Sequence, residues 1–184
     1  LRGENDQLPV YQVLEPSQKN DTNDPLLLAG TSEIFLASQH HNQIISSSKL
    51  PLKYVAVSHC FRSEVGHHTA ASRGLYRVHQ FTKVELFTIC KQEESTEAFA
   101  EITDLQRALL DELKLPYRVL EMARWELGAA AHRKWDHEVW MPGRGIWGEV
   151  MSTSNCTDYQ ARRLAIRHRT GPSEDLKFPH TLNG

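Results

Sequence analysis

Cysteine is scarce in this chain of 184 residues, and the few cysteines present are widely spaced. Cys60, Cys90 and Cys156 form no C-x-x-C pair. A structural zinc site needs closely spaced thiolates, and a disulfide framework needs more cysteines than these. The sequence therefore argues against both and suits a reducing compartment.

Long apolar runs and a strong net charge are also missing. No stretch approaches the roughly 18 apolar residues of a membrane span, so we expect no membrane partner. The formal net charge of -2 excludes a general electrostatic grip on nucleic acid and leaves room only for local RNA contacts. A hydrophobic fraction of 40% is ordinary for a globular protein and allows a buried core.

The start of the chain has neither a methionine nor the pattern of a secretory or transit peptide. We therefore read residues 1–184 as an excerpt of a longer protein. Without a secretory signal, the Asn-x-Thr matches at Asn20 and Asn155 are poor candidates for glycosylation.

Hydrophobic periodicity changes several times along the chain and predicts a mixture of strands and helices. We expect helices at 31–47 and 95–115, and strands at 10–14, 53–64, 76–90, 117–121, 135–141, 148–152 and 160–169. These elements do not alternate strictly between strand and helix, which favours an antiparallel sheet flanked by helices over a doubly wound one. The predicted fold class is therefore α+β.

The helix expected from Ser95 carries an apolar residue at every third or fourth position, and it ends before Pro116. Its expected buried face consists of Phe99, Ile102, Leu105, Leu109 and Leu113. We expect this face to pack against the sheet.

The strands at 53–64 and 76–90 are joined by a loop long enough to indicate a functional hairpin. Residues two apart on a strand share a face. Two groups follow: Arg62 with Glu64, and His79 with Phe81, Lys83 and Glu85. A guanidinium can bind phosphate or carboxylate, and an aromatic ring can support adenine. The same residues also fit an exposed sheet face with cross-strand ion pairs.

The text of this hairpin resembles a known signature. Phe61-Arg62-Ser63-Glu64, followed by Val78-His79-Gln80-Phe81 and Glu85, resembles the second signature motif of class II aminoacyl-tRNA synthetases, and HQFTKVE is similar to the seryl branch. Three further blocks agree with that branch: AGTSE at 29–33, EVMSTSNCTDYQARR at 149–163 and HTLNG at 180–184. Four blocks in order over most of the chain make the resemblance specific.

The resemblance implies the class II catalytic-domain fold and a set of site residues. The ATP-binding set is Arg62, Ser63, Glu64, Val78, His79, Gln80, Phe81, Glu149, Val150, Met151 and Ser152. The set for L-serine is Thr31, Ser32, Glu33, Arg62 and Glu85. Arg62 and Glu149 take the catalytic roles, with Glu149 near Mg²⁺ held through ATP. Met151 stands where the family usually has serine, and we expect only a local adjustment of the nucleotide pocket.

The implied activity is that of a serine–tRNA ligase, which makes seryl-adenylate from L-serine and ATP and transfers serine to tRNA(Ser). The family is expected to be homodimeric. GLYRVHQFTKVE, WMPGRG and SNCTDYQARR look like mitochondrial seryl enzymes, so we expect the mitochondrial matrix, and otherwise the cytoplasm. Residues 1–184 would be a partial catalytic domain without the N-terminal tRNA-binding arm, the first signature motif and the end of the third. Alone, this piece is expected to be inactive.

Two other functions fit the same blocks: a synthetase-like paralogue that binds nucleotide or RNA without aminoacylating, and a ligase that loads an amino acid onto a carrier protein. Gly143–Gly148 matches G-x-G-x-x-G, but Pro142 precedes it and a strand follows, so we predict a turn rather than a dinucleotide site.

Pairs such as His40-His41 and His67-His68 lack metal-ligand spacing. His67 and His68 fall in the hairpin loop, where RNA contact is one reading. The basic run at 162–169 reads as a solvated strand face or an RNA track.

Overall fold

The structure is a computed structural model, and it describes residues 10–13, 26–64 and 76–184. In chain order its elements are β1 (Gln12–Val13), β2 (Leu26–Leu27), α1 (Glu33–Ser38), β3 (Ile44–Ser46), η1 (Ser47–Lys49), β4 (Leu52–Phe61), β5 (Gln80–Cys90), η3 (Gln92–Glu94), α2 (Ser95–Glu112), β6 (Tyr117–Glu121), η4 (Arg124–Glu126), β7 (Arg133–Met141), β8 (Ile146–Asn155), α3 (Tyr159–Arg163), β9 (Arg167–Arg169) and β10 (His180–Asn183). Within the described ranges, no helix has the length and apolar character needed to cross a membrane.

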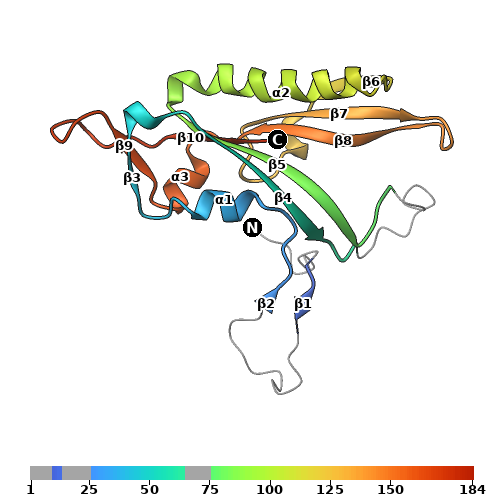
Figure 1. Ribbon diagram of the computed structural model, residues 1–184, viewed down its shortest axis with the longest axis horizontal. Helices are drawn as coiled ribbons and strands as arrows, with labels where there is room; N and C mark the ends of the chain where they lie inside the picture. Colours follow the sequence, from blue (N-terminus) through green and yellow to red (C-terminus); the bar gives the residue numbers. More distant parts are fainter. Residues whose placement is uncertain (1–9, 14–25, 65–75) are drawn as a thin grey trace. The chain divides into compact units, whose positions relative to one another are not determined.

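The chain divides into two compact units, and strands β4 and β5 run from one into the other. The first unit comprises residues 1–32 and 56–84, and the second comprises 33–55 and 85–184. The main sheet has six strands in the order β4-β5-β10-β8-β7-β6 (Figure 1). Its pairings from β5 through β6 are antiparallel, so the predicted α+β class with an antiparallel sheet is confirmed.

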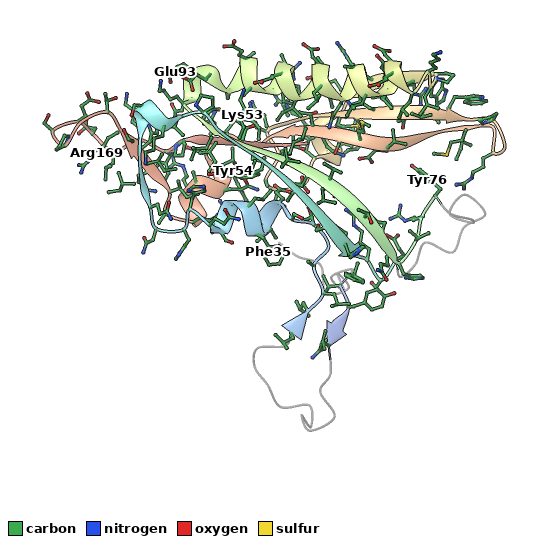
Figure 2. The ribbon with its side chains drawn as sticks, in the orientation of Figure 1. Phe35, Lys53, Tyr54, Tyr76, Glu93 and Arg169 are labelled. Carbon is green, nitrogen blue, oxygen red and sulfur yellow. The ribbon has the colours of Figure 1, made fainter. Side chains whose placement is uncertain are left out.

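In the second unit, α2 covers one face of the sheet, where it packs against β8 and β10 (Figure 1). The core beneath it consists of Cys90, Ala98, Phe99, Ile102 and Leu182, with Leu86 and Trp135 at its edge. Gly184 follows β10 at a close approach, because a methyl group there would clash with Ile102. Lys53 of β4 points toward α2 and pairs with Glu101 at 2.5 Å (Figure 2).

The buried face of α2 differs from the predicted one. Leu105, Leu109 and Leu113 are 48%, 44% and 63% exposed, while Gln106 is buried. The amide of Gln106 donates to the Ser152 carbonyl at 2.8 Å. Its oxygen accepts from the Thr153 hydroxyl at 2.7 Å. A polar side chain whose hydrogen bonds are satisfied can lie inside, and the apolar period alone could not show that.

The helix expected at 31–47 is shorter than predicted. α1 ends at Ser38, and Asn42 has a left-handed backbone (φ 63°), a conformation that asparagine tolerates better than most residues. The chain then forms β3, which pairs in parallel with β9. The strand expected at 160–169 is likewise replaced by α3 and β9, with a left-handed Ala165 (φ 52°) between them.

Other predicted elements agree with the structure more closely. Strands β6, β7 and β8 and helix α2 lie where periodicity put them, with shifts at the ends. The glycine-rich stretch contains the tight turn between β7 and β8, where Gly145 has φ 64° and its amide bonds to the Met141 carbonyl at 2.9 Å. Strands flank this turn on both sides, so the expected turn is confirmed and the dinucleotide reading is excluded.

Candidate active site

In the first unit, Arg62 and Phe81 lie together just beyond β4 and at the start of β5. The guanidinium carbon of Arg62 is 5.1 Å from the centroid of the Phe81 ring, a cation–π contact. The backbone holds this arrangement: the Arg62 amide donates to the His79 carbonyl at 3.0 Å, and the Phe61 amide donates to the Ala29 carbonyl at 2.8 Å. Because the guanidinium covers one face of the ring, an adenine base would stack on the other face or displace it.

Glu64 does not lie on the strand that the sequence predicted for it. β4 ends at Phe61, and Glu64 has a left-handed backbone with φ 51°. Its carboxylate forms an ion pair with Arg77. Strand parity therefore does not apply to Arg62 and Glu64, and an adenine amino group would share the Glu64 carboxylate with Arg77.

The first unit contains four more residues that were predicted to bind ATP: Ser63, Val78, His79 and Gln80. Ser63 and Val78 are half-buried, while His79 and Gln80 are exposed. The ring of His79 is hydrogen-bonded through Nδ1 to the Tyr11 hydroxyl at 2.7 Å. Sequence reasoning missed Tyr11, because nothing in its local pattern connects it to a hairpin almost 70 residues away.

Thr31 and Ser32 are linked to the two strands that carry Arg62 and Phe81. The ammonium of Lys83 on β5 donates to the Thr31 hydroxyl at 3.2 Å. The hydroxyls of Ser32 and Ser58, the latter on β4, are 2.5 Å apart. Strand parity grouped Lys83 with Phe81, but it gave Lys83 no role. The structure thus connects Thr31 and Ser32, two residues predicted to bind L-serine, to the hairpin within the first unit.

In the second unit, the strand register defines one sheet face that carries Glu85. Asn183 of β10 is opposite Phe87 on β5 and opposite Ser154 on β8. Opposite residues of an antiparallel pair share a face, and so do Phe87 and Glu85, which are two apart. Leu182 points the other way, into the core under α2. We call the face with Glu85, Asn183 and Ser154 the carboxylate face, and α2 does not cover it.

A β-bulge at Val150 decides which residues of β8 reach the carboxylate face. Glu149 is opposite Glu138, whereas Met151 is opposite His137, so Val150 is an extra residue without an opposite partner. On a regular strand Glu149 and Met151 would share a face. The bulge puts them on opposite faces of the sheet.

Lys134 connects Glu149 to the carboxylate face. Lys134 is opposite Ser154, and its ammonium lies 3.5 Å from the Glu149 carboxylate. Ser152 is two residues from Ser154 on the same strand and shares its face. The register therefore brings Glu85, Glu149 and Ser152 to one face of the second unit. The resemblance assigned the first to L-serine and the other two to ATP.

Met151 lies on the other face of the sheet from Glu149, and its expected effect on the nucleotide pocket stays a prediction. Its opposite partner, His137, is fully buried, and burial lowers the pKa of that imidazole. Val150 is 46% exposed at the bulge itself. A methionine in place of the family's serine therefore adds apolar surface on the side of the sheet that α2 covers.

Glu33 begins α1, also in the second unit, and is held by a residue that the sequence did not single out. The side-chain amide of Gln160 in α3 donates to the Glu33 carboxylate at 2.5 Å. Glu85 is fully buried. Sequence patterns could not pair Glu33 with Gln160, since 127 residues separate them.

Two of the three cysteines, Cys90 and Cys156, are unsuited to act as nucleophiles. Burial, reinforced by the charge of Glu33, raises the pKa of Cys156 to about 12. Burial likewise raises the pKa of Cys90 to about 12, with smaller contributions from Glu94 and Glu93. A thiol with such a pKa stays protonated at neutral pH and is unreactive.

The histidine pairs and the basic run at 162–169 were the remaining candidates for metal or RNA binding. In the described part of the chain, no group of three or more His, Cys, Asp and Glu side chains could hold a metal ion. The loop histidines His67 and His68 lie outside the described residues. The basic run is not a single strand: in α3, Arg162 pairs with Asp158 at 2.7 Å, and its guanidinium lies 4.3 Å from the Phe178 ring centroid.

Comparison with known proteins agrees with this geometry. The family model described as tRNA synthetase class II core domain (G, H, P, S and T) matches residues 11–184. A serine–tRNA ligase of Rhodopirellula baltica is 51% identical over 165 residues, covering 88% of this chain and 39% of the relative. One of Treponema denticola is 52% identical over 159 residues, covering 85% and 37%. The chain thus spans less than two-fifths of the length of these relatives.

Solved structures show the same similarity. The crystal structure of seryl-tRNA synthetase from Pyrococcus horikoshii complexed with ATP superposes with a TM-score of 0.86 at 44% identity, covering 95% of this chain and 37% of that one. The cytoplasmic Serine-tRNA ligase of Naegleria fowleri in complex with AMP gives 0.84 at 36% identity, covering 95% and 40%. The fold is that of a class II aminoacyl-tRNA synthetase catalytic domain. The chain belongs to the tRNA synthetase class II core-domain family that serves the G, H, P, S and T enzymes.

Proposed function

We propose that the full-length protein is a serine–tRNA ligase that activates L-serine with ATP and transfers serine to the 3′ end of tRNA(Ser). The observation that carries the proposal is the 51% identity to serine–tRNA ligases over 88% of this chain. The family model matches residues 11–184, which include all four sequence blocks. The strand register brings Glu85, Glu149 and Ser152 to one face of the second unit.

In this reaction the protein mainly positions the two substrates and neutralises charge, and it forms no covalent bond with them. A carboxylate oxygen of serine attacks the α-phosphorus of ATP, the bond to the bridging oxygen breaks, and pyrophosphate leaves. Arg62 can bind the serine carboxylate and the α-phosphate through its planar fork of donors. Phe81 provides the ring surface for adenine, and Glu64 accepts from the adenine amino group. Ser63, Val78, His79 and Gln80 complete the nucleotide side of the first unit.

L-Serine is recognised by polar groups that alanine cannot satisfy. We assign its binding to Thr31, Ser32, Glu33, Arg62 and Glu85, with Glu85 reading the ammonium and hydroxyl. Glu85 is fully buried. Hydrogen bonds between its carboxylate and the substrate would therefore be shielded from water, and charge-assisted hydrogen bonds are strong. A substrate without the hydroxyl would leave such buried acceptors unpaired, and rejection by a factor of about 10⁴ is reachable in polar pockets of this kind.

Magnesium fits this set of donors when it arrives with ATP. Glu149 offers hard carboxylate oxygens on an exposed part of the carboxylate face, and its side chain is 48% exposed. Mg²⁺ characteristically takes one or two carboxylates together with substrate phosphates rather than a full protein cage. When bound, the ion would neutralise charge on the phosphates, and Glu149 would hold it beside Val150 and Ser152.

We further propose that the protein acts in the mitochondrial matrix and forms a homodimer. The first proposal is supported by GLYRVHQFTKVE, WMPGRG and SNCTDYQARR, which resemble mitochondrial seryl enzymes. The second is supported by the family resemblance and by Val57 and Val84, which are 69% and 56% exposed in the first unit. Apolar side chains of this kind are suited to burial between subunits. Fractionation of cells and light scattering of the full-length protein test the two proposals separately.

The decisive experiment is serine-dependent exchange of pyrophosphate into ATP by the full-length protein, with Arg62→Ala as the control. We expect exchange in the wild type and a loss of at least about 100-fold in the variant, since Arg62 neutralises charge that develops at the phosphate. Absence of exchange in the wild type would refute the ligase assignment. Exchange without charging of tRNA would favour a ligase that acts on a carrier protein.

A further inference from the structure

Gln160 of α3 makes a side-chain hydrogen bond that joins two of the sequence blocks. Its Nε2 lies 2.5 Å from Oε1 of Glu33, the first residue of α1. An ionised carboxylate only accepts hydrogen bonds, so the amide must present its NH₂ group to Glu33. The chemistry of the pair fixes the orientation of the amide, and the bond is charge-assisted and therefore strong.

The helix that carries Gln160 is itself firmly placed. Ala161 is fully buried. Just before α3, the Cys156 amide donates to the Thr181 carbonyl and the Thr181 amide donates to the Thr157 carbonyl, both at 2.9 Å. These bonds join the segment to β10. Gln160 therefore projects from a support that is part of the main sheet.

The far end of α1 is tied to the same support through the backbone. After α1, the Asn42 amide donates to the Leu164 carbonyl at 2.8 Å, and the Arg167 amide donates to the Gln43 carbonyl at 2.9 Å. The parallel pairing of β3 with β9 continues this connection. Backbone bonds thus hold the C-terminal end of α1 to the α3–β9 segment, and the Gln160 side chain links its N-terminal end, where Glu33 lies.

Cys156 connects the neighbourhood of Glu33 with the carboxylate face. The charge of Glu33 contributes to the raised pKa of the buried Cys156 thiol. That thiol in turn donates to the Asn183 side-chain oxygen at 3.7 Å, and Asn183 shares its face with Glu85. Glu33, Cys156 and Asn183, from three of the sequence blocks, are thus linked through Cys156 within the second unit.

We propose that Gln160 is a positioning residue for L-serine: it fixes the Glu33 carboxylate and thereby sets the affinity for the amino acid without contacting ATP. This inference rests on the proposed function, because it uses the assignment of Glu33 to the serine site. Gln160 acts through Glu33, so its effect belongs to serine binding alone.

The test measures the KM for serine and the KM for ATP separately in pyrophosphate exchange by the full-length protein. Gln160→Leu keeps the size of the side chain and removes the hydrogen bond. We expect its KM for serine to rise about 10-fold or more, the loss typical for a bond to a charged group, with the KM for ATP within about twofold of wild type. Arg163→Ala, an exposed change on the same helix, is the matched control and should leave both values unchanged.

Gln160→Glu adds a reading that a merely structural role would not give. Two carboxylates this close cannot both be ionised without repulsion, so the pair binds a proton more readily. The protonated form restores a donor toward Glu33. We therefore expect the KM for serine of this variant to approach the wild-type value as the pH is lowered from about 8 to about 6, and to rise again in base.

The outcomes separate this inference from the proposed function. If the wild type shows exchange but Gln160→Leu leaves the KM for serine unchanged, the inference alone is wrong. A parallel rise of both KM values with a lower melting temperature, and no recovery of Gln160→Glu in acid, would likewise reduce Gln160 to a structural role. If the wild type shows no exchange, the function and the inference fall together.

Discussion

Lys134 and Glu149 lie on neighbouring strands of the sheet, and 3.5 Å separates the ammonium nitrogen of one from the carboxylate of the other. The lysine also pairs with Asp136 at 2.7 Å, so it does not neutralise Glu149 alone. Glu149 is half exposed on the carboxylate face, with oxygens able to bind a metal that accompanies ATP. We therefore expect Glu149 to contribute to catalysis through its charge and to add little to the stability of the fold.

Glu149→Gln should therefore lower kcat for pyrophosphate exchange by about 100-fold or more in the full-length protein, since in the proposed site it removes charge next to the phosphates. The melting temperature should change little, because an exposed ion pair contributes little to stability. Glu138→Gln is the matched control: Glu138 lies opposite Glu149 on the same face and pairs with Arg118. Equal losses in the two variants would contradict a specific role for Glu149.

The bulge at Val150 gives a second prediction, which concerns backbone length. Deleting Val150 makes Glu149 and Met151 neighbours on a regular strand, so Glu149 stays opposite Glu138 and Met151 stays opposite His137. Both side chains keep their present faces, and we expect pyrophosphate exchange by the full-length protein to stay within about 10-fold of wild type, as for a modest shift of catalytic geometry. Val150→Ala keeps the extra residue and should change exchange by less still. Exchange below about 1% of wild type in the deletion variant would contradict this and show that the bulge itself orients Glu149.

The bulge also shows where prediction from sequence reaches its limit. Strand periodicity located β7 and β8. The bulge, however, adds one residue to β8, and nothing in the local sequence EVMS at 149–152 predicts it. Without the bulge, parity puts Met151 with Glu149, which the structure contradicts. Similarly, β4 ends at Phe61 and Glu64 has a left-handed backbone, although the residue types predicted a strand through Glu64.

Contacts between distant segments could not be derived from periodicity at all. Arg62 and Phe81 were assigned to one ATP-binding set because both belong to one hairpin and one motif, but their direct contact was not predicted. Gln160, by contrast, is linked to Glu33 across 127 residues, and its own pattern predicted a strand. Local preferences determine helices and strands, whereas such links depend on the packing of the complete sheet.

The buried Gln106 provides a stability prediction that tests the corrected face of α2. Its amide bonds to the Ser152 carbonyl and the Thr153 hydroxyl, so Gln106→Ala leaves two buried polar groups without their partner and also removes side-chain volume. We expect a loss of about 2–4 kcal/mol in the free energy of unfolding.

Urea denaturation of the variants checks this prediction, with Leu105→Ala as the control on the same helix. Leu105 is 48% exposed, and its truncation should cost at most about 1 kcal/mol. A larger cost at Leu105 than at Gln106 would support the apolar face expected from the sequence and contradict the one in the structure.

Buried histidines predict how stability depends on pH. Burial lowers the pKa of His137, His168 and His180, so each favours the neutral form in the folded state. At pH values above about 6.5 both states are neutral and these groups contribute no pH dependence. Below that value the unfolded chain binds protons that the folded chain does not, so stability falls as the pH falls, until the lowered folded pKa is reached.

The expected slope is up to about 1.4 kcal/mol per pH unit for each histidine, in the window just below about pH 6.5. Urea midpoints of the chain measured between about pH 8 and 5 give this slope. His137 is fully buried, and His137→Phe should make the slope shallower while leaving its sign unchanged. The hydrogen bond with Arg162 is the main cause that lowers the pKa of Asp158. Carboxylates of this kind titrate at lower pH and therefore do not contribute to the slope of stability in this pH range. Stability that rose with acid, or a slope unaffected by His137→Phe, would show that His137 is not held neutral in the fold.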